Sequence, residues 1–364
     1  MKWSWKIANV AGIDVHLHMT FLILIVWIGL GYWQLAGTVD AVVSGVSFIL
    51  ALFFCVLLHE FGHALTARQF GIRTKSIMLL PIGGIASIEK MPEDPRQEIL
   101  IALAGPAVSF AIALLLWILL KMGNGLIPLE GLSVTGGSFV QRLMIVNILL
   151  AAFNLLPAFP MDGGRVFRAL LSLRMEPVKA TRIAAVVAQA FAILMAVLGF
   201  RYNLFLVFIA VFIWIGAVAE ARMANVKFAL SGLSVGKAML TDFQVLQHDE
   251  SLAQAVKLTL SGTQKDFPVL AGDKVIGVLR QSDLLRGLHD HGKLCRVDQE
   301  MQGDVPHADI SEPLEAVMER MQVGESGLLI VTDGSRIAGI IDIDNIMELL
   351  RIQKALHEHD EHRW

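Results

Sequence analysis

Long apolar runs alternate with short polar segments over the first 222 residues of the chain. Each run is close to the ~20 residues that a helix needs to cross a bilayer. The pattern therefore predicts about six transmembrane helices, and no convincing signal-peptide cleavage site precedes the first of them. The predicted spans are residues 17–36, 41–66, 98–120, 139–157, 180–200 and 203–222.

The pattern changes after Asn225, where charged residues and glycines break the apolar segments into short pieces. Two stretches then repeat one order: a short strand, an amphipathic helix, two strands joined by a turn, and a second helix. We therefore predict a polytopic α-helical membrane protein with a soluble α/β module of two repeats. The predicted parts are a membrane domain at 1–224, a linker at 225–233, repeats at 234–290 and 297–354, and a His-rich tail at 355–364.

The charged residues predict the orientation of the spans. Lysines and arginines gather in the loops after the second and fourth spans, whereas Lys121 and Arg201 stand almost alone in the opposite loops. By the positive-inside rule both termini and the repeat module are cytoplasmic, and we expect the plasma membrane of a prokaryotic cell. The basic residues on the cytoplasmic side are Arg68, Arg73, Lys75, Lys90, Arg96, Arg165, Arg168, Arg174, Lys179 and Arg182.

The composition agrees with a membrane protein and argues against other classes. Of the 364 residues, 55% are hydrophobic, which is above the share usual in soluble proteins. The net charge of −3 and the lack of a basic cluster in the sequence give no sign of nucleic-acid binding. The two cysteines, Cys55 and Cys295, lie in unlike surroundings, so no disulfide framework is predicted.

The second span contains the motif HEFGH at residues 59–63, although ionisable residues are costly inside a bilayer and mark functional sites there. On a helix, His59 and His63 project from nearly the same face, where two imidazoles can bind one tetrahedral zinc. Glu60 lies about 100° around the helix, so it can act as a general base without binding the metal. Cys55 is about 12 Å of helix rise from His63, which is too far for both to bind one ion.

A third ligand must come from another span. Asp162, in the motif NLLPAFPMDGG, lies at the cytoplasmic end of the fourth span, the same end at which His59 and His63 lie. Prolines interrupt the helix there, and irregular backbone at membrane depth is tolerated only where it is buried in protein or lines a wet cavity. We therefore predict Asp162 as the third ligand. His16 and His18 are the alternatives, and a plain helix stop would leave Asp162 in a loop.

The motifs HEFGH and NLLPAFPMDGG, in this order and at this depth, resemble the site-2 protease family of intramembrane zinc metalloproteases. Two further motifs, LPIGGIA at 80–86 and LAGPAVS at 103–109, extend the resemblance over the region from Gly12 to Arg222. The resemblance implies cleavage of a peptide bond within or next to a transmembrane segment of a protein substrate, the reaction of regulated intramembrane proteolysis. A transporter or channel gated by the C-terminal repeats is the alternative, but it leaves HEFGH unexplained.

The resemblance also implies roles for individual residues. One zinc per chain would be held by His59, His63 and Asp162, with Glu60 as general base. Asn154 would hold the substrate strand or stabilise the oxyanion, unless it only bonds a neighbouring helix. The segment MLLPIGGIASIEK resembles the family's membrane-dipping hairpin, whose edge can pair with an unwound substrate, with a plain cytoplasmic hairpin as the alternative. Its candidate substrate-binding residues are Pro81, Gly83 and Gly84.

The two repeats resemble CBS domains, named after cystathionine β-synthase, which pair into one module and often bind adenine nucleotides. In nucleotide-binding members a hydroxyl residue meets phosphate and an aspartate holds the ribose. Here GVLRQSD has Arg280 at the first position and keeps Asp283, whereas GIIDIDN has Asp342 and Asn345. We therefore expect an adenine nucleotide, if one binds, at Asp283, with homo-oligomerisation through the module as the alternative role. The expected partners are a transmembrane protein substrate and membrane lipid, and no nucleic acid.

Overall fold

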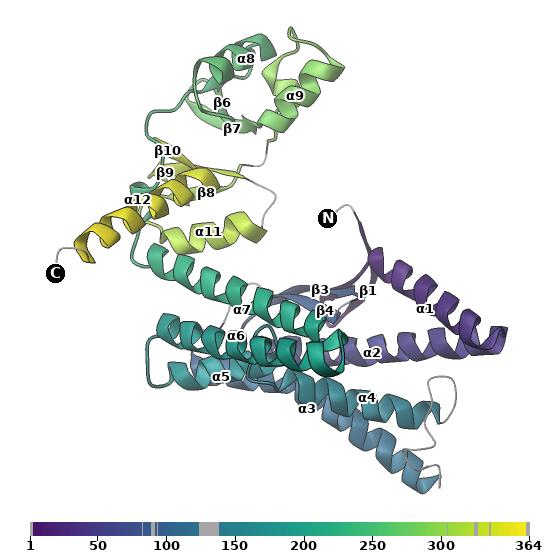
Figure 1. Ribbon diagram of the computed structural model, residues 1–364. Helices are drawn as coiled ribbons and strands as arrows, with labels where there is room; N and C mark the ends of the chain where they lie inside the picture. The colour runs from purple at the N-terminus through teal and green to yellow at the C-terminus, as the bar shows by residue number, and fades with distance from the viewer. Residues whose placement is uncertain are drawn as a thin grey trace. The chain divides into compact units, whose positions relative to one another are not determined.

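Figure 1 shows a computed structural model of the chain, which describes residues 3–81, 83–88, 92, 94–123, 138–303, 305–323, 327–334 and 336–361. The chain forms two compact units, Met1–Ala224 and Asn225–Trp364. Lys90 and residues 362–364 of the predicted His-rich tail lie outside the described residues.

Helices dominate the first unit. Within the described residues, four of them are long and apolar enough to cross a membrane: α2, α3, α6 and α7. Two further apolar helices, α1 and α4, are shorter, so the structure does not establish the count of about six spans. The helices are α1 (Thr20–Ala36), α2 (Val39–Gln69), α3 (Pro95–Met122), α4 (Phe139–Asn154), α5 (Asp162–Ser172), α6 (Pro177–Tyr202) and α7 (Phe205–Leu230).

Local signals set the ends of several helices. Gly37 ends α1 in a left-handed conformation with φ 66°, which a glycine adopts without a steric penalty. Thr38 then caps α2, because its side chain accepts a hydrogen bond from the backbone N–H of Ala41. Asp94 caps α3 in the same way, and Pro95 occupies the first helical position, where its missing N–H costs nothing.

A four-stranded sheet lies beside α2 (Figure 1). The strands run in the order β1 (Ser4–Val10), β2 (Ile13–His18), β3 (Thr74–Leu80), β4 (Gly83–Ile88), so β4 is an end strand. Our prediction of the N-terminal region missed β1 and β2, although IDVHLH alternates apolar and polar residues as a half-buried strand does. The buried side chains that join β2 and β3 to α2 are Ile13, Val15, Phe61, Ala64 and Ile77.

The sheet therefore packs on the half of α2 that contains HEFGH. On another side, α3 approaches α2 closely at Gly62, where a Cβ atom would lie 2.8 Å from the backbone oxygen of Ala104. The segment before Asp162 is buried against α6 and α7. Its residues Ala158, Phe159 and Met161 form a core with alanines of both helices and with Ile213 of α7. Close backbone packing thus surrounds the predicted metal site.

The second unit contains two three-stranded sheets with the same strand order, and each repeat has the predicted succession of strand, helix, two strands and helix. Buried side chains from both sheets, including Val278 and Ile340, form one shared core. The first repeat comprises β5 (Leu246–Gln247), α8 (Leu252–Ser261), β6 (Phe267–Ala271), β7 (Lys274–Leu279) and α9 (Gln281–Asp290), followed by α10 (Val297–Glu300). The second comprises β8 (His307–Asp309), α11 (Leu314–Val323), β9 (Leu328–Asp333), β10 (Arg336–Asp342) and α12 (Ile343–Glu361).

Candidate metal centre

Three buried side chains from two helices meet at one point in the first unit. His59 and His63 lie on α2, and Asp162 is the first residue of α5. The two imidazole Nε2 atoms are 3.1 Å apart, and each lies 3.2 Å from Oδ2 of Asp162. The three atoms therefore form a nearly equilateral triangle.

The triangle fits a tetrahedral zinc ion. Zinc bonds of about 2.0–2.1 Å at tetrahedral angles place neighbouring ligand atoms roughly 3.3 Å apart, close to the observed separations. Nδ1 of His63 lies 2.7 Å from the backbone oxygen of Ile101, which can only accept a hydrogen bond. His63 must therefore carry its proton on Nδ1, which leaves the Nε2 lone pair directed at the centre of the triangle. Nδ1 of His59 lies 3.0 Å from the hydroxyl of Ser109, which can also accept a hydrogen bond from an imidazole N–H.

One stripe of α3 supports both histidines. Ile101, Gly105 and Ser109 are spaced by four residues and so share a helix face. Gly105 lies between the two hydrogen-bonding residues, and a Cβ atom there would lie 2.6 Å from Nε2 of His59 and closer still to Nε2 of His63. Sequence reasoning missed this stripe. The motif LAGPAVS contained the signal, but its meaning depends on how α3 packs against α2.

Tight turns hold Asp162 in place. Gly163 and Gly164 pack directly on the backbone of residues 155–159, so that neither position has room for a Cβ atom. The next turn of α5 is fixed to α3, because Arg168 forms a half-buried ion pair with Glu98. The breaks at the prolines and glycines of NLLPAFPMDGG thus direct a carboxylate towards α2.

Glu60 lies outside the triangle and next to the β3–β4 hairpin. A Cβ atom on Gly84 would lie 2.5 Å from Cγ of Glu60 and 3.1 Å from its Oε1. The hairpin that contains Pro81, Gly83 and Gly84 therefore runs past the expected general base. Asn154 is half-buried at the last residue of α4, eight residues before Asp162 in the chain.

The alternative ligands lie elsewhere. His16 and His18 are on β2, where His18 lies 2.8 Å from the hydroxyl of Thr20. Neither belongs to the group of His59, His63 and Asp162, and Cys55, which is buried on α2, does not belong to it either. Of the ligands considered from the sequence, the structure brings together only the set that includes Asp162.

The candidate nucleotide-binding residue of the second unit is buried. Asp283 is 2% exposed, and its two oxygens accept hydrogen bonds from Arg286 at 2.8 Å and Gln302 at 2.9 Å. The residues at the equivalent positions of the second repeat, Asp342 and Asn345, stabilise the start of a helix. Asp342 and Asn345 exchange hydrogen bonds between side chain and backbone, an arrangement that caps α12. Burial also raises the pKa of Asp342.

Comparisons with known proteins find a family match in each of the two units. The sequence profile of "Peptidase family M50" matches residues 47–137 and 132–198, and that of "CBS domain" matches residues 235–290 and 297–352. A zinc metalloprotease of Methanocaldococcus jannaschii is 30% identical over 363 residues, which cover 98% of this chain and 100% of that protein. The protein Rip3 of Mycobacterium tuberculosis is 29% identical over 97% of this chain and 94% of its own length.

Among solved structures, the site-2 protease from Methanocaldococcus jannaschii is 34% identical and covers 60% of this chain and 96% of its own, with a TM-score of 0.46. The match to the whole length of a zinc metalloprotease does not favour a transporter or channel. This chain therefore belongs to peptidase family M50, the site-2 proteases, and is an intramembrane zinc metalloprotease with two CBS domains.

Proposed function

We propose that His59, His63 and Asp162 hold one zinc ion per chain and that Glu60 is the general base. The observation that supports this assignment is the triangle of Nε2, Nε2 and Oδ2 atoms, together with the hydrogen bond that orients His63. Zinc, when bound, supplies Lewis-acid polarisation of the scissile carbonyl and makes water a stronger nucleophile at neutral pH. Glu60 takes a proton from the attacking water and later passes it to the leaving amine nitrogen.

The test of this function is a comparison of membranes from cells that produce either the wild-type protein or the Glu60→Gln variant. We expect a transmembrane protein that is cleaved in the first and intact in the second. Quantitative proteomics of both membranes measures the difference and identifies the substrate. Equal cleavage patterns in the two membranes would contradict the proposed role of Glu60.

We propose that the substrate binds as an added strand along β4. This strand is at the end of its sheet, and Gly84 places it against Glu60, so an extended segment paired with β4 would pass the general base. A transmembrane helix must unwind locally before it can pair in this way. Asn154 would then donate a hydrogen bond from its amide to the substrate strand or to the oxyanion.

The Gly84→Val variant should cleave its substrate at least about tenfold more slowly while its zinc content stays unchanged. The added side chain would clash with Cγ of Glu60 and displace the general base. A general base typically accelerates a reaction by about 10²–10⁴-fold, so even a partial displacement should slow cleavage by more than tenfold. Cleavage of a reconstituted transmembrane substrate and elemental analysis measure the two quantities.

The matched control for this variant is Ser87→Val on the same strand. Residues 84 and 87 point to opposite faces of β4, and Ser87 is exposed, so this change should leave cleavage nearly unaltered. Equal activity of Gly84→Val and the wild type would remove the hairpin from the mechanism.

We further propose six spans, with both termini and the CBS unit in the cytoplasm of a prokaryotic cell and with lipid around the helices. The distribution of lysine and arginine supports this orientation. Large exposed apolar residues on every long helix, such as Phe54, Leu114, Leu194 and Phe208, support contact with lipid. Reporter fusions at the C-terminus and in the loop after α3 would test the orientation.

The CBS unit should modulate the protease, and we propose Asp283 as its contact with an adenine nucleotide. A nucleotide has to displace Arg286 or Gln302 from this buried carboxylate, and the side chain of Arg286 is 60% exposed. Asp283→Ala should weaken nucleotide binding by about tenfold or more, because the loss of one hydrogen bond to a charged group lowers affinity by a factor of this size. Asn345→Ala should have a smaller effect on binding, because Asn345 caps α12.

Titration calorimetry of the full chain with AMP, ADP and ATP measures these affinities. If none of the three nucleotides bound to the wild type, the nucleotide proposal would fall. Homo-oligomerisation through the CBS unit would then be its remaining proposed role, which light scattering of the purified chain measures.

A further inference from the structure

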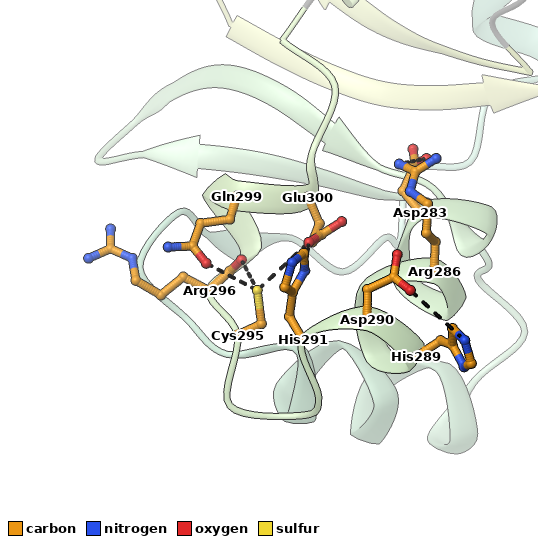
Figure 2. A network of polar contacts seen from close by, with 9 residues as sticks. All are labelled: Asp283, Arg286, His289, Asp290, His291, Cys295, Arg296, Gln299 and Glu300. Carbon is orange, nitrogen blue, oxygen red and sulfur yellow. Dashed lines mark hydrogen bonds and ion pairs between the residues drawn. The ribbon is translucent and has the colours of Figure 1, made fainter.

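A second group of metal-binding residues lies in the first CBS repeat, within the described part of the chain. Figure 2 shows His291, Cys295 and Glu300 converging between the end of α9 and the helix α10. Their candidate ligand atoms all lie within 4.8 Å of one another. Nδ1 of His291 is 2.7 Å from Oε1 of Glu300, and Sγ of Cys295 is 3.9 Å from the same oxygen.

The surroundings of Cys295 are rich in acceptors. Its thiol can donate one hydrogen, yet three oxygens lie within reach: the backbone oxygen of Arg296 at 3.6 Å, Oε1 of Gln299 at 3.1 Å and Oε1 of Glu300. Burial and the neighbouring charge of Glu300 raise the pKa of this thiol. A cation at this position would offset the excess of electron-rich atoms and favour the thiolate.

We propose that His291, Cys295 and Glu300 form a second metal site, selective for zinc or a similar borderline-soft divalent ion. Neutral imidazole, thiolate and carboxylate carry two negative charges and so balance such an ion, and all three are zinc ligands. Tetrahedral zinc keeps such atoms about 3.3–3.6 Å apart, so small movements of the side chains suffice. The side chain of His291 is 61% exposed and can make them, while Glu300 is 8% exposed and fixed.

The site would connect metal binding to the rest of the repeat. It joins the end of α9 to α10, and Gln302, two residues after Glu300, binds the carboxylate of Asp283 on α9. An ion held by His291, Cys295 and Glu300 would stiffen the segment that positions Gln302. The CBS unit would thereby respond to a metal ion, whether or not it binds a nucleotide.

The full-length protein, stripped with a chelator and reloaded with Co²⁺, tests the proposal. A cobalt–thiolate bond gives a charge-transfer absorption in the near ultraviolet. The candidate centre of the first unit, the membrane unit, contains no sulfur ligand and so cannot give this band. We expect this band in the wild type, and we expect Cys295→Ser and His291→Ala to abolish it and to lose one equivalent of zinc per chain. His291 is mostly exposed, so its variant spares the core of the repeat.

Three controls separate this site from the other groups. His289→Ala changes an exposed histidine two residues away, and Cys55→Ala removes the other cysteine, so both should keep the band. Asp162→Ala should also keep it, which makes the result independent of the membrane site. The absence of the band in the wild type, or its survival in Cys295→Ser, would overturn the proposal and leave a hydrogen-bonded connection between α9 and α10.

Discussion

Purified Glu60→Gln protein should keep the zinc of its membrane unit and lose peptidase activity by about 10²–10⁴-fold, the contribution typical of a general base. The side chain of Glu60 lies against Gly84 and outside the triangle of ligand atoms, so its charge is not needed to hold the ion. Glutamine has nearly the same shape but cannot take a proton from water. Cleavage of a reconstituted transmembrane substrate measures the loss.

Variants of the three proposed zinc ligands provide the comparison for Glu60→Gln. His59→Ala, His63→Ala and Asp162→Ala should each lower both activity and zinc content, because each removes one corner of the triangle. Zinc is best counted by elemental analysis in a Cys295→Ser background, so that only the membrane unit contributes. A Glu60→Gln protein without zinc, together with an Asp162→Ala protein that retained it, would require the two roles to be reassigned.

Local sequence was sufficient to select the three residues that the structure brings together. The spacing of His59 and His63 fixes their relative position on any helix, and the prolines and glycines around Asp162 indicate a break in the fourth span. Their role as zinc ligands stays a prediction. The hairpin of β3 and β4 was expected from the resemblance of its segment to the family's hairpin. Its contact with Glu60 was not expected, because that contact depends on how the sheet packs on α2.

Other features could be read only from the folded chain. The alternation in β2 was overlooked because the apolar run that follows it suggested a span from residue 17, whereas α1 begins at Thr20. The helix α5 was hidden in a polar segment that we interpreted as a loop. In the CBS unit, the departures at Asp342 and Asn345 looked like lost nucleotide contacts, and the structure shows that they cap a helix.

The role of Gly105 could not be predicted from the sequence, because it depends on how α3 packs against α2. Gly105→Ala should lower zinc affinity by at least about 10–100-fold, although no ligand changes, because mutations of supporting residues have effects of this size. The new Cβ atom would lie 2.6 Å from Nε2 of His59 and nearer to Nε2 of His63, so it would clash with both proposed ligand atoms. Metal sites tolerate errors of only about 0.2 Å in ligand distances, so the imidazoles cannot move aside and still bind.

Helix propensity cannot account for such a loss, because alanine favours a helix over glycine by about 1 kcal/mol. Gly31→Ala on α1 is the matched control, since among the described residues nothing lies within 4 Å of a Cβ atom there. This control should bind zinc as the wild type does. Competition with a chromogenic chelator measures the affinities, and circular dichroism verifies that both variants stay helical. If Gly105→Ala bound zinc as tightly as Gly31→Ala, the ion could not lie between His59 and His63, and the proposed centre would be wrong.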